Sequence, residues 1–230
     1  MTDVKAGVEY KINVDGNTFL LDSKKYNLLM SIWETGSITA AAKEINVSYR
    51  TALNYIDKIE STLDVKVVST TKGGKGGGGG TSLTEEGYSI IKECKKINAI
   101  MELHKDVNEI EATVIDINDS KGVMTIKLND FEVNAPLNRN YEVGDEILAL
   151  ISYDNIFLML EPQTSSIRNI LKGQIVEMRL EGEIIRVKIN TSGIILCSDI
   201  TVSAEKELNL TIGKEVYIGF KAMSVATLKL

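Results

Sequence analysis

The run TKGGKGGGGGTSLT, residues 71–84, follows a helix-turn-helix pattern and precedes an amphipathic helix. Seven of its residues are Gly, and Lys72 and Lys75 are basic. A flexible linker would be richer in Ser and would separate two complete domains, whereas this run interrupts a single unit. We interpret it as a wing, because Gly lets the backbone approach a polyanion and lysines bind phosphates without reading sequence. A P-loop is excluded, because Lys75 is followed by Gly76 and not by Ser or Thr.

The residues before this run predict a hairpin and a first helix. Residues 8–20 alternate between apolar and polar side chains around the turn VDGN at 14–17, as a two-stranded hairpin would. Between residues 24 and 33 apolar side chains recur at helical spacing, and Gly36 is placed to end that helix.

Further helices complete the pattern. Ser37 or Thr39 is placed to cap the short helix ITAAAKEI, and Ser48 to cap the helix SYRTALNYIDKIESTL. A long helix is predicted over residues 83–103, and such a helix either pairs with its twin or leads to the next domain. The apolar stripe of the helix after Ser48 comprises Ala52, Leu53, Ile56, Ile59 and Leu63.

This layout is typical of a DNA-binding domain in which a recognition helix enters the major groove and a wing follows. Arg50 is the best candidate for a guanine contact and Asn54 for an adenine contact, because each side chain can bond two atoms of a base edge. The alternative is an ordinary solvated helix face, or contacts to phosphate only. The predicted DNA-binding residues are Ser48, Tyr49, Arg50, Thr51, Asn54, Lys58, Lys72 and Lys75.

The second half of the chain contains an internal repeat. EATVIDI at 111–117 matches KGQIVEM at 172–178, and GDEILALIS from Gly144 matches GKEVYIGFK from Gly213. The offset grows from 61 to 69 residues, which predicts an eight-residue insertion in the second copy around residues 200–210. Each copy reads as about five short strands, which suggests a small OB-like β-barrel with little helix.

The chain is therefore predicted to be a multidomain α+β protein. We expect a winged helix-turn-helix domain with a linker or dimerisation helix over residues 1–105 and two tandem OB-like barrels over 106–161 and 162–230.

Composition restricts the classes of function. The net charge of −6 divides into +1 for residues 1–105 and −7 for the remainder, so basic residues that bind DNA must be clustered. No long uncharged apolar stretch or signal peptide is seen, and we expect a cytoplasmic protein that does not bind a membrane. One His and the distant Cys94 and Cys197 provide neither a disulfide framework nor a metal-cation site, and no nucleophile motif indicates an enzyme.

The segment from GSITAAAKEINVSYR through the glycine-rich run resembles the winged-helix domain of ModE-type molybdate-responsive regulators, which are related to LysR-type DNA-binding domains. The resemblance covers about the first 100 residues. The SYR at the start of the recognition helix and the GGKGGGG wing make it more specific than a generic helix-turn-helix match.

The stretch TSSIRNILKG, residues 164–173, resembles the Mop or TOBE module of molbindins and of ModE effector domains. The resemblance implies a molybdate or tungstate site, usually between subunits, built from the motif S-x-R-N-x-L-K-G and a later K-A-x-S-V stretch. The T-x-x-S element of the family departs from its pattern here, because its Ser falls on Ala204. The implied oxyanion residues are Ser166, Arg168, Asn169, Thr201, Ser203, Lys221, Ala222 and Ser224.

Chemistry supports this implication independently. A tetrahedral dianion needs convergent hydrogen-bond donors and positive charge, which Arg, Lys, Ser and Thr supply. The first copy lacks these groups, since Ser152 stands where Lys221 stands in the second, and one site per protomer is expected. The alternative is that Arg168 and Lys221 are ordinary surface charges on a structural barrel.

We therefore expect a homodimeric transcriptional regulator, not an enzyme, that binds a pseudo-palindromic DNA operator and responds to molybdate or tungstate. The resemblance implies that it controls oxyanion uptake genes. One alternative is an intracellular molybdate buffer, and another is a winged-helix regulator with a different effector or none.

Overall fold

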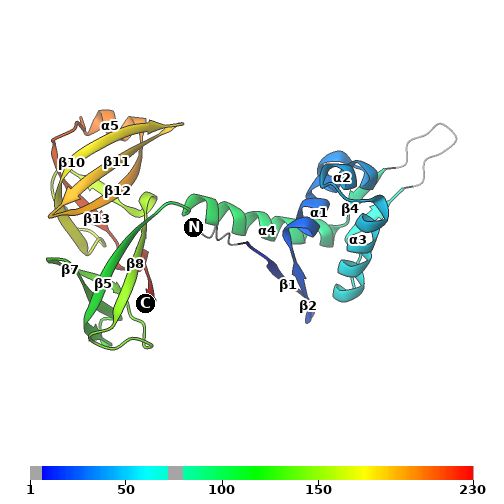
Figure 1. Cartoon of the computed structure of the whole chain (residues 1–230), viewed down its shortest axis with the longest axis horizontal. Coiled ribbons are helices and arrows are strands. Elements are labelled where there is room, and N and C mark those ends of the chain that lie inside the picture. Colours follow the sequence, from blue (N-terminus) through cyan, green and yellow to red (C-terminus); the bar gives the residue numbers. More distant parts are fainter. Residues whose placement is uncertain (1–6, 72–79, 230) are drawn as a thin grey trace, which may run out of the picture. The chain divides into compact units, whose positions relative to one another are not determined.

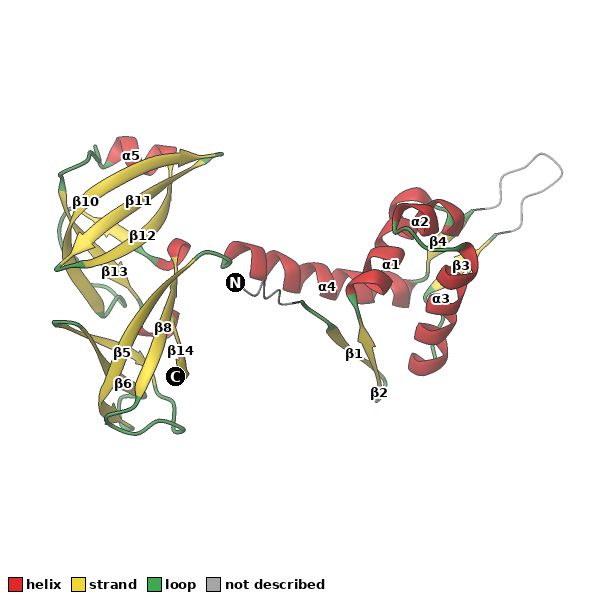
Figure 2. Cartoon of the chain, in the orientation of Figure 1, coloured by secondary structure: helices red, strands yellow, loops and turns green. Residues whose placement is uncertain are grey.

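The computed structural model describes residues 7–71 and 80–229, which divide into two compact units, Met1–Ile100 and Met101–Leu230. Helices dominate the first unit and strands the second (Figure 2). No helix of the described residues is both long enough and apolar enough to cross a membrane.

The first unit contains two hairpins and four helices among its described residues (Figure 1). Asp15 and Gly16 turn the first hairpin with φ angles of 49° and 90°, as the predicted VDGN turn requires. Gly36 ends the first helix with φ 65°, and the side chain of Ser37, not Thr39, caps the second. The elements are β1 Tyr10–Val14, β2 Asn17–Leu21, α1 Ser23–Thr35, α2 Ile38–Glu44, α3 Tyr49–Leu63, β3 Val68–Thr70, β4 Thr81–Leu83 and α4 Glu85–Leu103.

The apolar stripe of α3 packs into the core as predicted, except that Leu53 is only partly buried. The wing strands β3 and β4 pair antiparallel, and the segment between them, with Lys72 and Lys75, lies outside the described residues.

The start of the wing is held between α3 and α4. Glu60 of α3 is 8% exposed, and its Oε1 accepts hydrogen bonds from the backbone N–H groups of Val67 (3.0 Å) and Val68 (3.2 Å). Lys66 forms an ion pair with the same carboxylate. A Cβ at Gly87 of α4 would lie 2.1 Å from the carbonyl oxygen of Val67, so α4 approaches this backbone as closely as only Gly allows. The recognition helix is therefore bonded directly to the residues at the start of the wing, Val67 and Val68.

The second unit contains two five-stranded antiparallel sheets, ordered β14-β8-β5-β6-β7 and β12-β11-β10-β13-β9. The first copy of the repeat comprises β5 Val107–Asn118, β6 Val123–Leu128, β7 Phe131–Pro136, β8 Glu146–Ser152, the 3-10 turn η1 Tyr153–Asn155 and β9 Phe157–Met159. The second comprises β10 Asn169–Glu181, β11 Ile184–Thr191, β12 Ile194–Thr201, α5 Val202–Glu207, β13 Glu215–Phe220, η2 Ala222–Ser224 and β14 Val225–Lys229.

The predicted repeat is present in the backbone. The pairing register shifts after Val114 in β5 and after Ile175 in β10, positions 61 residues apart. In each copy the carbonyl beside this bulge accepts from a Gly N–H at 2.8 Å, from Gly144 in the first and Gly213 in the second. The short helix α5 lies within the segment predicted as an insertion.

The two copies exchange their last strands. β9 of the first copy pairs with β13 of the second, and β14 of the second pairs with β8 of the first. One continuous apolar core joins both sheets. The predicted boundary at residues 161 and 162 therefore separates the repeats along the chain but not two independent barrels. The two compact units divide at Ile100, within α4 and five residues before the predicted boundary at residue 105.

A pair of buried asparagines joins the copies symmetrically. The side chain of Asn108 in β5 accepts from the Cys197 N–H (2.7 Å) and donates to the Cys197 carbonyl (2.9 Å). Asn169 of β10, 61 residues later, makes the same two bonds to the backbone of Asn134, at 2.7 and 2.9 Å. Each Asn thus binds a strand of the other copy.

We expect Asn108→Ala to lower the free energy of unfolding by about 1–3 kcal/mol, because it leaves the Cys197 N–H buried and unpaired. Asn169→Ala should cost a similar amount, and the exposed control Asn140→Ala less than about 0.5 kcal/mol. Urea denaturation measures all three variants. Equal stability of Asn108→Ala and Asn140→Ala would contradict a stabilising role for the asparagine pair.

Candidate functional site

The recognition helix α3 begins with a hydroxyl cap. Ser48 Oγ accepts the Thr51 backbone N–H at 3.0 Å and lies 2.8 Å from Thr51 Oγ1. These two predicted DNA-binding hydroxyls are therefore also engaged in starting the helix.

The predicted base-reading side chains follow one row of the helix. Arg50, Asn54 and Lys58 are exposed and succeed one another every four residues, so they lie side by side opposite the buried stripe. Tyr49 at the start of the helix is 50% exposed. Among the described residues, neither Arg50 nor Lys58 forms an ion pair, so both charges are available for a polyanion.

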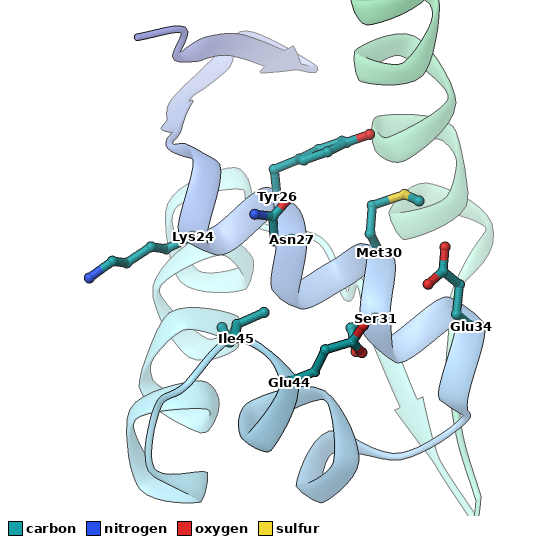
Figure 3. Close-up of a pocket in the computed structure, with 8 residues that line it drawn as sticks. All are labelled: Lys24, Tyr26, Asn27, Met30, Ser31, Glu34, Glu44 and Ile45. Carbon is teal, nitrogen blue, oxygen red and sulfur yellow. The ribbon is translucent and has the colours of Figure 1, made fainter. Parts of the chain in front are cut away.

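A pocket of about 400 Å³ opens between α1 and α2 (Figure 3). It contains none of the predicted site residues, and Ser31 at its base donates a hydrogen bond to Glu44. Its two carboxylates would repel a phosphate. The pocket is lined by Lys24, Tyr26, Asn27, Met30, Ser31, Glu34, Glu44 and Ile45.

The predicted oxyanion residues fall into two groups in one chain. The first group lies at one end of the β10–β13 pair, where the register opposes Asn169 to Phe220. Arg168 and Lys221 are the next residues outward on the two strands, so they emerge at the same end. Both are exposed, and neither forms an ion pair within the described part of the chain.

The loop before β10 orients the arginine. Arg168 Nη1 donates to the Ser165 carbonyl at 2.8 Å. Ser166 is exposed beside it. On the β13 side Lys221 leads into η2, where Ala222 is buried and Ser224 is partly exposed. We name Ser166, Arg168, Lys221 and Ser224 the cationic corner.

Asn169 was predicted as an oxyanion residue, but its amide is already occupied. It is 3% exposed and both of its polar atoms bond the Asn134 backbone. The internal repeat could have indicated this structural role. The first copy lacks the cationic residues but has Asn108 at the position equivalent to Asn169, so this Asn is present where no anion is expected.

Thr201 and Ser203 form the second group, at the opposite end of β10. At this end Glu181 of β10 pairs with Ile184 of β11, and Ile184 pairs in turn with Thr201 of β12. The cationic corner lies next to Asn169, at the other end of β10. The intervening 13 residues of β10 have a contour of roughly 40 Å. Thr201 Oγ1 caps α5 by accepting the Ala204 N–H (3.1 Å), and Ser203 Oγ donates to Glu207 (2.7 Å). One chain therefore does not bring the two groups together.

Comparisons with known proteins find matches for the helical part and for the β-sheet part of the chain. Residues 24–88 match the bacterial regulatory helix-turn-helix proteins of the lysR family, and residues 165–227 match the TOBE domain. The molybdenum transport protein ModE of Azotobacter vinelandii is 25% identical, with 98% of each chain covered. The transcriptional regulator ModE of Yersinia pestis is 25% identical over 90% of this chain and 93% of its own.

A solved structure shares the fold of the second unit. ModG, described as a cytoplasmic molybdate-binding protein and crystallised with molybdate, aligns with a TM-score of 0.50 and 21% identity over 54% of this chain and 96% of its own. The lysR-type match covers the recognition helix, and the TOBE match covers both groups of predicted oxyanion residues. This chain therefore joins a lysR-type helix-turn-helix domain to a TOBE domain, and it is similar to ModE proteins along nearly its whole length.

Proposed function

We propose that this chain is a DNA-binding transcriptional regulator whose effector is molybdate or tungstate. The observation that carries the proposal is the cationic corner, where Arg168 and Lys221 emerge side by side without a carboxylate partner among the described residues. The ModE relatives and molybdate-bound ModG support molybdate as the ligand class.

The corner fits a tetrahedral dianion. Arg168 and Lys221 supply positive charge and several N–H donors, and Ser166 and Ser224 add hydroxyls. Charge-assisted hydrogen bonds to an oxyanion are stronger than neutral ones. An acceptor-only carboxylate at the contact would oppose binding, and none of the four residues is acidic.

We further propose that a second copy of the chain completes the site. Thr201 and Ser203 lie at the far end of β10 from the cationic corner of their own chain. They can serve the same anion only if they come from another subunit. In that arrangement Met223, which is 74% exposed between Lys221 and Ser224, would be covered by the partner.

The long helix α4 offers a surface for the homodimer. Its face with Ile90, Ile91 and Cys94 is buried in the first unit. Near the C-terminal end of α4, Ile97 and Ile100 extend the apolar surface of the helix but are 44% and 60% exposed. We propose that two α4 helices pair through these residues, which would present two recognition helices to a pseudo-palindromic operator.

In this proposal the row Arg50, Asn54 and Lys58 reads bases and phosphates, and Lys72 and Lys75 of the wing add phosphate contacts. The regulated genes would be those of oxyanion uptake. A molybdate buffer without regulation would have no use for the exposed, unpaired charges of α3.

Calorimetry with the full-length chain tests the effector. We expect about one molybdate or tungstate per chain, with sulfate much weaker, and a loss of affinity of roughly 10- to 100-fold in Arg168→Ala and in Lys221→Ala. The control Lys188→Ala removes a lysine of the second unit that is paired with Glu177 (3.0 Å) and should leave binding unchanged. Unaltered binding in both test variants would remove the cationic corner from the site.

DNA binding is tested with a duplex selected from a random library by the unmodified protein. Arg50→Ala should weaken this complex by about 1–3 kcal/mol and relax the preference at one base pair, because a bidentate contact is lost. Lys11→Ala on the exposed strand β1 is the matched control for loss of one positive charge. An affinity and base preference for Arg50→Ala equal to those of the control would refute the assigned role.

Analytical ultracentrifugation tests the dimer. We expect twice the chain mass for the unmodified protein, and dissociation for Ile97→Asp combined with Ile100→Asp, because two carboxylates would be buried without partners. The exposed control Lys95→Ala, whose side chain faces Trp33 of the same unit, should remain dimeric. A dimer that survives the double substitution would place the interface elsewhere.

A further inference from the structure

Arg186 of β11 is the centre of an ion-pair cluster that lies outside the proposed oxyanion site. Its side chain is 19% exposed. It binds Asp199 of β12 through two bonds, Nε to Oδ1 and Nη2 to Oδ2, both 2.8 Å. This bidentate geometry fixes the guanidinium relative to β12.

The same guanidinium binds the segment that enters the second unit from α4. Arg186 Nη2 donates to Asp106 Oδ2 at 2.6 Å. Asp106 stands between α4 and β5, and its carbonyl accepts the Tyr153 N–H at 3.0 Å. His104, two residues earlier, pairs through Nδ1 with Asp154 of η1 at 3.0 Å. The segment 104–106 is thus fastened to the body of the second unit by side chains and backbone.

Asp199 connects this cluster to the second group of proposed oxyanion residues. It precedes Thr201 by two residues on β12, and the register opposes Asp199 to Arg186 and Thr201 to Ile184. Thr201 also caps α5, so a ligand that takes this hydroxyl would compete with the cap at the end of β12 that carries Asp199.

The centre of the cluster is shielded by an aromatic ring. The Arg186 guanidinium lies 4.8 Å from the centroid of the Tyr153 ring, which covers it from solvent. Burial raises the pKa of Tyr153 to about 12, so this phenol is neutral at ordinary pH and the cluster's charge balance does not depend on it. Breaking a partly buried ion pair leaves an uncompensated charge, so a displaced Asp199 should carry Arg186 with it.

We propose that Arg186 couples the Thr201 element to the linker of the DNA-binding unit through Asp199 and Asp106. This coupling rests on the proposed function, since it supposes an anion that contacts Thr201 or Ser203. The anion would favour one arrangement of β12, and Arg186 would transmit that preference to segment 104–106. A ligand shifts such an equilibrium only by its difference in affinity for the two arrangements, and the effect is reciprocal between anion and DNA.

Asp106→Ala cuts only the linker arm of the cluster, because the two bonds between Arg186 and Asp199 and the backbone bond of residue 106 remain. The matched control is Glu181→Ala, which removes another carboxylate of Arg186 (3.0 Å) that is not in the linker. Asp106→Glu restores the charge. Comparable unfolding temperatures of the two alanine variants exclude a general loss of structure.

The measurement is the affinity of the full-length chain for the library-selected duplex with and without saturating molybdate, together with calorimetry of molybdate in the absence of DNA. Molybdate should change the affinity of the unmodified chain for DNA by about 5- to 150-fold. In Asp106→Ala that ratio should fall to about twofold or less, with molybdate affinity within about threefold of normal, whereas Glu181→Ala should keep the full ratio. Asp106→Glu should recover part of it.

Two results would overturn the coupling and can be told apart. A full molybdate effect on DNA affinity in Asp106→Ala would refute the coupling and leave the proposed function intact. Absence of molybdate and tungstate binding by the unmodified chain would refute the proposed function and the coupling together.

Discussion

The exchange of strands between the two copies of the repeat holds the second unit together. Without that exchange each sheet would have four strands and would end at β8 or β13, whose outer backbone groups would be unpaired. Here each copy of the repeat lends its last strand to the other, β9 to β13 and β14 to β8, and the two asparagines fasten the exchange. Because the copies share one core, a movement in one cannot be independent of the other.

The exchange also makes the unit nearly symmetric, so that differences between equivalent positions are informative. Arg168 and Lys221 of the cationic corner correspond to Val107 and Ser152 in the first copy. Neither of these two positions of the first copy therefore carries a cation. The equivalent corner of the first copy holds instead the entry segment from α4, with Asp106 bound to Arg186 and Asp154 bound to His104. One corner is open to a ligand and its counterpart is filled by the chain's own carboxylates.

Much of the fold could be predicted from sequence because its signals are local. Caps at Ser37 and Ser48 and the left-handed Gly36 set the helices of the first unit, and these depend on a few neighbouring residues. The repeat was recognisable because its glycine turns recur at fixed offsets. The strand exchange was not, since β9 and β14 pair with residues more than 50 positions away and their own alternation suits either sheet.

The site was predicted less completely for a related reason. Sequence motifs identify residue types but not whether their polar atoms are free. Asn169 belongs to the same motif as Arg168, yet its amide is consumed by the Asn134 backbone. Glu60 is the opposite case, a polar residue whose burial the sequence does not reveal. A carboxylate within an amphipathic helix is expected to face solvent, but Glu60 is buried because it accepts hydrogen bonds from the N–H groups of Val67 and Val68.

The two ends of β10 differ in the charged groups that lie next to them. The Asn169 end carries unpaired cations, and the end near Thr201 lies next to the carboxylate cluster that holds the entry segment. If a second copy supplies Thr201 to the cationic corner, each bound anion joins the corner of one chain to the Arg186 cluster of its partner. The linker that responds would then belong to the chain opposite the one that supplies the charge. In a dimer built in this way, an anion bound by the cationic corner of one subunit would also engage the DNA-binding linker of the other, so the two subunits would respond together.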